Sequence, residues 1–267
     1  ICLMHGMEVD YYKKLFQTIG NILDLIEKDD MPKYLLFLEN AFPYMDNYNY
    51  HKGMKGIIQE LKVLLKTKSI GTDSDRALLL DFQAALETQP EKAIKLEKNA
   101  LAQIENITAD NARLVSNLHA NLGGLYRMNG YPDLAREHME KSISLLDQFN
   151  LLHINDSIPQ IANYAMFLTE QQEPERGISE LQKLSGIIKE YHSDECLDYA
   201  KVQENLATIY LMTANLSQAK THFKKAFKIY EKIWADEPEM IEAKYREIQE
   251  LYPQIGFSIG KTLSGLL

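Results

Sequence analysis

The sequence has few of the residues that cross-link a protein or anchor it in a membrane. Its 267 residues include two cysteines, Cys2 and Cys196, too few for a disulfide framework or a structural zinc site. Such thiol use is typical of a reducing compartment, so we expect a cytoplasmic protein. No apolar run reaches the ~18 residues of a membrane helix. The first seven residues lack the basic region and apolar core of a signal peptide, and we expect no membrane contact.

Positive charge is also scarce. Lysine and arginine number 29 against 38 aspartates and glutamates, which gives a net charge of −9. Nucleic-acid-binding proteins usually gather basic residues on one face, and no long run of lysine or arginine occurs here. We therefore expect this chain to contact no nucleic acid directly. Because the sequence does not begin with methionine, we also expect it to be a fragment or a processed form of a longer protein.

Arrangements typical of catalysis are missing as well. No Ser/His/Asp or Cys/His order stands out, and no strand–turn–helix context is present to mount a nucleophile. His138 and His222 occupy equivalent places two repeats apart, which on stacked helices puts them roughly 20 Å or more from each other and too far apart to share a metal. The sequence thus predicts a protein that is not an enzyme and that holds no metal and no cofactor.

What the sequence does contain is an internal repeat. The stretch Asn121–Leu146 moved forward by 42 positions falls on Asn163–Ile188, and moved again it falls on Asn205–Tyr230, without a gap. An earlier unit covers roughly residues 72–108. The columns of the repeat are Asn121/Asn163/Asn205, small Gly123/Ala165/Ala207, small Ala135/Gly177/Ala219 and bulky Met139/Leu181/Phe223.

Each kind of column has a physical reason. Two helices cross at close range only where one of them presents almost no side chain, which explains the small columns. Large apolar residues three or four apart form the stripe that fills the remaining space. Pro90, Pro132 and Pro174 each suit the first turn of a second helix, because an N–H there would have no partner. In the last unit we expect Ser217 to start that helix.

These features resemble the tetratricopeptide repeat. Asn-Leu-Gly-Gly-Leu-Tyr at 121–126 and Asn-Leu-Ala-Thr-Ile-Tyr at 205–210 match the first half of its signature, and Ala219, Phe223, Ala226 and Pro238 match the second. The 42-residue period is similar to the kinesin-light-chain-like subgroup. The resemblance implies an all-α fold, a right-handed α-solenoid of antiparallel helix pairs. We expect an N-terminal helical segment at 1–70 that caps the array or is a decayed repeat, four repeats at 71–237, and a C-terminal capping helix and tail at 238–267.

Apolar periodicity and turn residues predict the helices individually. The Thr72–Asp75 stretch is a helix start by side-chain capping. The expected helices are 7–29, 32–45, 51–68, 73–88, 91–107, 110–129, 132–149, 156–171, 174–191, 194–214, 217–235 and 238–252.

The resemblance also implies a binding site. In the family the first helix of each unit lines the groove, and an asparagine there binds the backbone or terminal carboxylate of an extended peptide. A residue four positions earlier lies on the same helix face. The candidate peptide-binding residues are Arg113, Asn117, Asn121, Asn163, Lys201 and Asn205.

The site departs from the family's carboxylate clamp, because two of the clamp's cations are replaced here. We therefore expect the groove to bind the backbone of an internal or short peptide, since an asparagine amide offers both a donor and an acceptor. The alternative interpretation is that the asparagines bridge neighbouring first helices and touch no ligand.

Two functions remain open at this point. The first is a non-catalytic scaffold that holds a protein segment or peptide in its concave groove. The second is the ligand-sensing domain of a bacterial peptide-responsive regulator, whose output module lies outside this chain. The fold supports both uses. The sequence does not give the oligomeric state.

Overall fold

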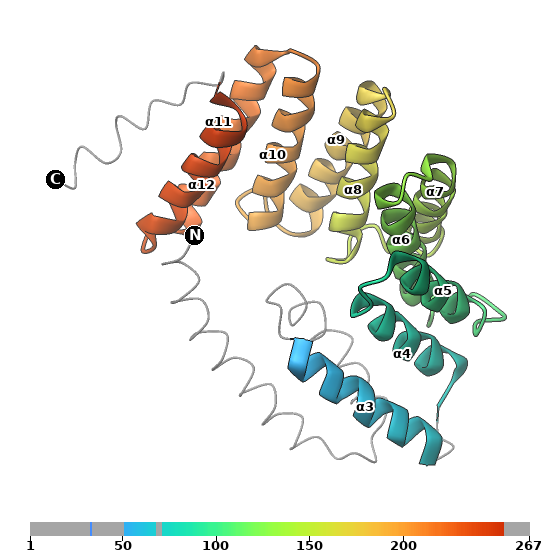
Figure 1. Cartoon of the computed structure of the whole chain (residues 1–267). Helices are drawn as coiled ribbons and strands as arrows, with labels where there is room; N and C mark the ends of the chain where they lie inside the picture. Colours follow the sequence, from blue (N-terminus) through green and yellow to red (C-terminus); the bar gives the residue numbers. More distant parts are fainter. Residues whose placement is uncertain (1–32, 34–50, 68–70, 254–267) are drawn as a thin grey trace. The chain divides into compact units, whose positions relative to one another are not determined.

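The structure is a computed structural model that describes residues 33, 51–67 and 71–253. The described residues form helices and no strand, which confirms the all-α prediction (Figure 1). The predicted helices at 7–29 and 32–45 lie outside the described residues, apart from Lys33, which is helical. The observed helices are α3 (His51–Thr67), α4 (Asp73–Ala85), α5 (Pro90–Leu101), α6 (Ala112–Met128), α7 (Pro132–Gln148), α8 (Ser157–Glu170), α9 (Pro174–Tyr191), α10 (Leu197–Met212), α11 (Leu216–Ile233) and α12 (Pro238–Leu251).

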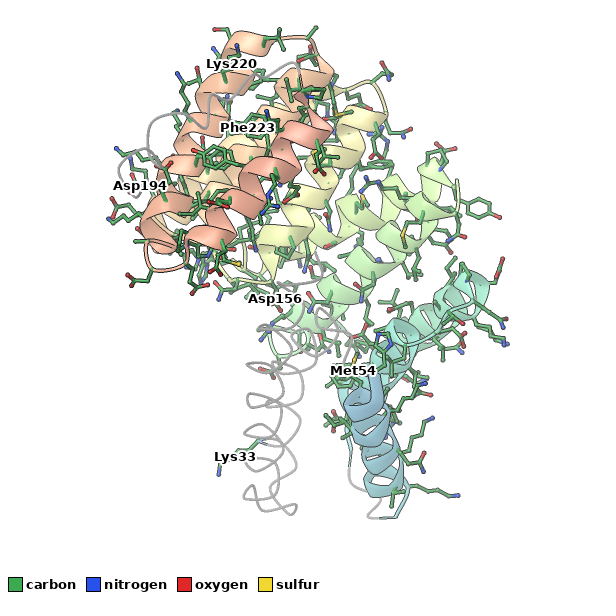
Figure 2. The ribbon with its side chains drawn as sticks, turned by 60° about the vertical axis from the view of Figure 1, so that its left-hand side comes forward. Lys33, Met54, Asp156, Asp194, Lys220 and Phe223 are labelled. Carbon is green, nitrogen blue, oxygen red and sulfur yellow. The ribbon has the colours of Figure 1, made fainter. Side chains whose placement is uncertain are left out.

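The contacts divide the chain into two compact units, residues 1–138 and 139–267. We call them unit 1 and unit 2 and describe each by itself. Their side chains are drawn in Figure 2, where Met54 marks unit 1 and Phe223 marks unit 2. Within the units, consecutive helices pack as antiparallel pairs, α4 with α5, α8 with α9 and α10 with α11. The predicted helix-pair architecture is therefore confirmed.

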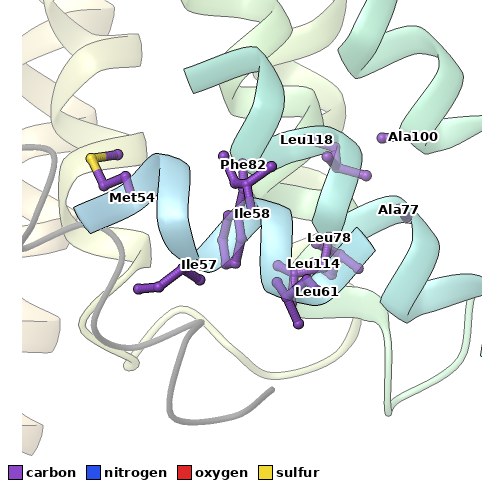
Figure 3. Close-up of a cluster of buried hydrophobic side chains, with 10 residues drawn as sticks. All are labelled: Met54, Ile57, Ile58, Leu61, Ala77, Leu78, Phe82, Ala100, Leu114 and Leu118. Carbon is purple, nitrogen blue, oxygen red and sulfur yellow. The ribbon is translucent and has the colours of Figure 1, made fainter. Parts of the chain in front are cut away.

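The core of unit 1 joins helices that are far apart in the sequence. Met54 and Leu61 of α3, Phe82 of α4, and Leu118 of α6 lie in one buried cluster (Figure 3). Met54, Leu61 and Leu118 have no exposed surface. The three- and four-residue spacing of the apolar positions on α3 places them on one face, and that face packs on the repeat helices.

Unit 2 has two apolar clusters that share α10. The first joins α8, α9 and α10 through residues such as Ile161, Leu181 and Leu206. The second joins α10, α11 and α12 through residues such as Ala207, Phe223 and Ile248. Because α10 contributes to both clusters, the helix pairs of unit 2 form one continuous stack.

Helix starts follow the sequence signals at most positions. Pro90, Pro132, Pro174 and Pro238 are each the first residue of a helix. Thr72 caps α4 with a capping box, in which its hydroxyl accepts from the Asp75 N–H at 3.2 Å and the Asp75 carboxylate accepts from the Thr72 N–H at 2.7 Å. These two bonds satisfy donors that would otherwise lack partners.

Several predicted boundaries differ from the structure by one to six residues, and two of them have a visible cause. Helix α11 does not start at Ser217, because Asn215 is the residue that caps it and accepts from the Gln218 N–H at 3.2 Å. Helix α5 ends at Leu101, well before the predicted residue 107. The Asn111 side chain holds the following loop, donating to the Asn106 carbonyl at 2.9 Å and accepting from the Thr108 N–H at 2.8 Å. The first of these bonds engages a carbonyl of the predicted helix and so competes with its continuation.

The turn inside each repeat closes in the same way in three successive units. Gly130, Gln172 and Ala214 are spaced by 42 residues, and all three have a left-handed backbone, with φ of 78°, 63° and 58°. Each sits in a Schellman motif. The closing bonds run from Tyr131 N to Tyr126 O at 2.9 Å, Glu173 N to Leu168 O at 2.9 Å and Asn215 N to Tyr210 O at 2.7 Å.

We expect Gln172→Gly and Ala214→Gly each to raise the free energy of unfolding by about 1 kcal/mol, because a left-handed φ is costly for residues with a Cβ. Urea denaturation followed by circular dichroism measures the change. Ala243→Gly, inside α12, is the matched control and should lower stability by about 0.5–1 kcal/mol. A loss of stability at all three positions would contradict the assignment of these turns.

Helix α12 continues the 42-residue register. Ile248 falls under the buried column Leu122/Tyr164/Leu206 and is itself only 1% exposed. Tyr245 of α12 stacks on Phe227 of α11 with ring centroids 4.1 Å apart. Helix α12 therefore packs on α11 with the pattern of the first helix of a further unit.

Candidate functional site

The candidate asparagines lie on the first helices of their repeats. In unit 1, Asn117 and Asn121 are on α6, one turn apart on the same face. In unit 2, Asn163 is on α8 and Asn205 is on α10, one turn after Lys201. Because α8 and α10 share one apolar cluster, the equivalent positions Asn163 and Asn205 belong to neighbouring helices of the same stack.

In unit 1 the amide of Asn121 is already engaged. Its Nδ2 donates to Asp81 Oδ1 at 2.8 Å and more weakly to Glu97 Oε1 at 3.4 Å. Asp81 belongs to α4 and Glu97 to α5, so Asn121 links α6 to the preceding helix pair. Arg113 and Asn117, on the same helix, are half-buried. In this unit the geometry matches the bridging alternative.

In unit 2 the same column differs in its contacts and not in its exposure, since Asn121 of unit 1 is itself exposed. Asn163 and Lys201 are exposed and Asn205 is half-buried. Within the described residues, no side-chain hydrogen bond or ion pair involves any of these three. Their amide and ammonium groups can therefore bind an incoming ligand without first breaking a polar contact to the part of the chain that the structure describes.

A half-buried ion pair lies next to Asn205. Lys244 of α12 contacts Glu204 of α10 at 2.8 Å, and Tyr230 donates to the other Glu204 oxygen at 2.6 Å. Burial works to lower the pKa of Lys244, but Glu204 and Glu247 together more than offset it, so that pKa is raised. Burial, followed by Glu204, also raises the pKa of the Tyr230 hydroxyl. Sequence reasoning missed Lys244, because α12 was interpreted only as a cap.

A second network lies beside Asn163. Tyr164, the next residue along α8, is buried, and its hydroxyl donates to Glu140 Oε1 of α7 at 2.8 Å. Arg176 of α9 donates to the same Tyr164 oxygen at 3.2 Å. These contacts tie the middle of α8 to both neighbouring helices, so the backbone that carries Asn163 is held in place.

The carboxyl pair beneath Asn121 is unusual for a repeat core. In the 42-residue register Glu97 takes the place of Met139, Leu181 and Phe223, and it is only 2% exposed. Burial, followed by the charge and hydrogen bond of Asp81, raises the pKa of Glu97 to about 10, while Asn121 opposes the shift.

Protonation accounts for this burial. Glu97 Oε2 is buried and accepts no hydrogen bond from a described residue. Two carboxylates this close would repel each other in a medium of low dielectric. A proton on Glu97 that is donated to Asp81 removes one charge and gives the buried oxygen a partner. The 42-residue register indicates this pair in the sequence, because Asp81 likewise occupies the position of the small residues Gly123, Ala165 and Ala207.

The histidines in equivalent places hydrogen-bond within their own units. His138 Nδ1 lies 2.9 Å from His119 Nδ1, and His222 Nδ1 lies 2.9 Å from Gln203 Oε1. Burial lowers the pKa of both His138 and His222. Across residues 51–67 and 71–253, no group of three or more histidine, cysteine or acidic side chains is arranged to hold a metal ion.

Comparison with known proteins identifies the repeat. Residues 157–232 match the tetratricopeptide repeat family. Nothing among the curated proteins matches the chain. Solved structures do match it. One is BtubC (BKLC) from P. vanneervenii, with 18% identity, a TM-score of 0.57, and coverage of 72% of this chain and 74% of that one.

A second solved structure has the same kind of repeat. It contains the nearly identical tetratricopeptide-like repeats of a putative kinesin light chain from Podospora anserina. The identity is 15%, the TM-score is 0.58, and the match covers 74% of this chain and 96% of that one. At these identities the likeness concerns the fold. In the part of the chain that the structure describes, no helix is both long and apolar enough to cross a membrane.

Proposed function

We propose that this chain is a non-catalytic cytoplasmic scaffold that binds an extended protein segment or peptide along α8 and α10, because residues 157–232 match the tetratricopeptide repeat family. Repeats of this family generally bind other proteins. The observation that supports the proposal most directly is a difference in side-chain contacts among the three asparagines of the repeat column. The Asn121 side chain is engaged by two carboxyls, whereas the side chains of Asn163 and Asn205 form no hydrogen bond within the described residues.

The chemistry of the two asparagines suits an extended backbone. Each amide offers one acceptor and two donors, and a peptide in β-conformation presents its N–H and C=O groups at regular intervals. Lys201, one turn before Asn205, adds a positive charge for an acidic side chain or a terminal carboxylate of the ligand. The networks around Tyr164 and Glu204 fix the two helices, so little ordering is needed on binding.

The test is a paired substitution in the full chain. A randomised 12-residue peptide library is selected on the protein, and enriched peptides are measured by fluorescence polarisation. We expect Asn163→Ala with Asn205→Ala to weaken binding at least tenfold, and to leave the melting temperature nearly unchanged because neither amide has a partner to lose among the described residues.

Asn121→Ala is the matched control from the same column. It should lower the melting temperature, because it removes the donor to Asp81 and Glu97, and it should leave peptide affinity intact. The proposal is wrong if no peptide is enriched, or if the double variant binds as well as the unchanged chain. Short free peptides recovered with the protein from its native host would direct the proposal to the peptide-sensing alternative.

A further inference from the structure

Helix α11 presents opposite faces of different character. Its apolar face is buried against α10 and α12. The buried residues of this face are Ala219, Phe223, Ala226, Phe227, Ile229 and Tyr230. The helical period then directs Lys220, Lys224, Lys225 and Lys228 outward, and all four are exposed. We call these four residues the lysine face; Lys220 marks its beginning in Figure 2.

The lysine face is not neutralised within the described protein. No ion pair joins its four members to a carboxylate of the described residues. Lys232, at the end of α11, does pair with Glu195. The single acid of the helix, Glu231, accepts a hydrogen bond from Tyr245 at 3.0 Å. Helix α11 therefore has five lysines and one glutamate in a chain whose net charge is −9.

This arrangement works against the helix itself. Lys220, Lys224 and Lys228 follow each other at four-residue spacing, where like charges destabilise a helix. Helix α9, the second helix of the preceding repeat, avoids this arrangement. Its Lys183 pairs with Glu180 at 2.8 Å, and its Lys189 pairs with Asp194 at 3.1 Å. Internal stability thus does not explain the lysine face.

We propose that the lysine face of α11 binds an acidic segment of another polypeptide. Lysines four residues apart on a helix rise by about 6 Å along its axis. Glutamates at four-residue spacing on a partner helix have the same rise, and alternate residues of an extended segment advance by about 6.6 Å. Either kind of acidic segment can place one carboxylate against each lysine. This surface is separate from Asn163 and Asn205, and the two proposals can fail independently.

The composition of the surface favours a polypeptide over a nucleic acid. Single-stranded nucleic acid is usually bound by basic side chains interleaved with exposed aromatic rings on which the bases stack. The aromatic rings Phe223, Phe227 and Tyr230 of α11 are buried. The negative net charge of the chain also repels a densely charged polyanion at long range.

The packing of α11 also disfavours a membrane. An interfacial helix inserts its apolar face between lipids, whereas the apolar face of α11 forms part of the core of unit 2. Of these three anionic partners, a polypeptide segment with few, spaced carboxylates fits the observed face best.

The test uses the full chain and a fluorescein-labelled helical peptide with four glutamates at four-residue spacing. Lys224→Glu is the informative variant. It replaces two repulsive lysine pairs by attractive ones, so the melting temperature should stay the same or rise, while affinity for the acidic peptide falls at least fivefold. The matched control is Lys62→Glu on α3, an exposed lysine with the same change of charge, which should leave affinity within twofold.

Three comparison probes decide the class of partner. They are the same peptide with glutamine in place of glutamate, a 16-nucleotide single strand, and vesicles containing 30% anionic lipid. Tighter binding of the acidic peptide, weakened about tenfold between 20 and 200 mM salt, supports the proposal. Tighter lysine-dependent binding of the nucleotide or the vesicles overturns it. Equal losses in the Lys224 and Lys62 variants, or no binding by any probe, also overturn it.

Discussion

Replacing Gly177 by alanine should lower the free energy of unfolding by about 1–3 kcal/mol, the range for overpacking a well-filled core. Gly177 lies in the buried small column with Ala135 and Ala219. A Cβ at residue 177 would lie 2.6 Å from the backbone oxygen of Ala165 and 2.7 Å from the Thr169 hydroxyl oxygen. The first of these atoms belongs to the main chain of α8, so α8 and α9 would have to move apart.

Gly186→Ala, in the same helix, is the matched control. A Cβ there would meet no heavy atom within 4 Å, so the substitution should raise stability by about 0.5–1 kcal/mol through helix propensity. Urea denaturation of both variants measures the two effects, which have opposite signs. If Gly177→Ala were as stabilising as Gly186→Ala, the close approach of α8 and α9 would be refuted.

A stability profile against pH should show that Glu97 is folded in its protonated form. Its pKa is raised from 4.5 to about 10 in the folded protein, so between these values the folded state holds a proton that the unfolded chain has released. The contribution of Glu97 is then fully present below pH 4.5 and is lost as the pH rises. The expected slope from this one group is about −1.4 kcal/mol per pH unit.

Glu97→Gln isolates this slope. Glutamine resembles the protonated carboxyl and does not titrate, so the variant should match the unchanged chain near pH 4.5 and become progressively more stable than it toward pH 9. Glu91→Gln, an exposed position on the same helix α5, should give a nearly constant difference over the same range. A constant difference for Glu97→Gln as well would show that Glu97 is ionised in the folded protein.

The helix pairs could be predicted because their causes are local and repeated. Prolines at Pro90, Pro132 and Pro174 set the helix starts, and the 42-residue register identifies the small and bulky positions that must face each other. Helix α3 was predicted within one residue, because its apolar stripe and flanking polar residues leave little choice. Local signals of this kind do not depend on knowing the tertiary contacts.

The turns show that residue type does not predict the backbone conformation at every position. Glycine is the residue that usually adopts a left-handed φ, and Gly130 does so. Gln172 and Ala214 adopt the same conformation, although neither residue type indicates it. Their conformation follows from the closing bonds to Leu168 and Tyr210, which the packing of each helix pair imposes.

The candidate site shows the same limit. Asn121, Asn163 and Asn205 are identical in type and register, so the sequence could not distinguish them. Their difference arises from the preceding pair of helices, where Asp81 and Glu97 engage Asn121. The register did place these two acids in core columns, and a comparison of columns across units could have found the pair.

The repeated Schellman turns have a consequence for how such a chain can be rearranged. Gly130, Gln172 and Ala214 share one backbone conformation and one kind of closing bond. A segment cut at equivalent positions of two of these turns therefore begins and ends in the same local structure, and we call such a segment a cassette. Joining residue 130 directly to residue 173 would leave one such turn at the junction, and duplicating residues 131–172 would add one. Shortening or lengthening the array by whole cassettes is therefore the change that this architecture tolerates best, and it would alter how many first helices are available to a ligand.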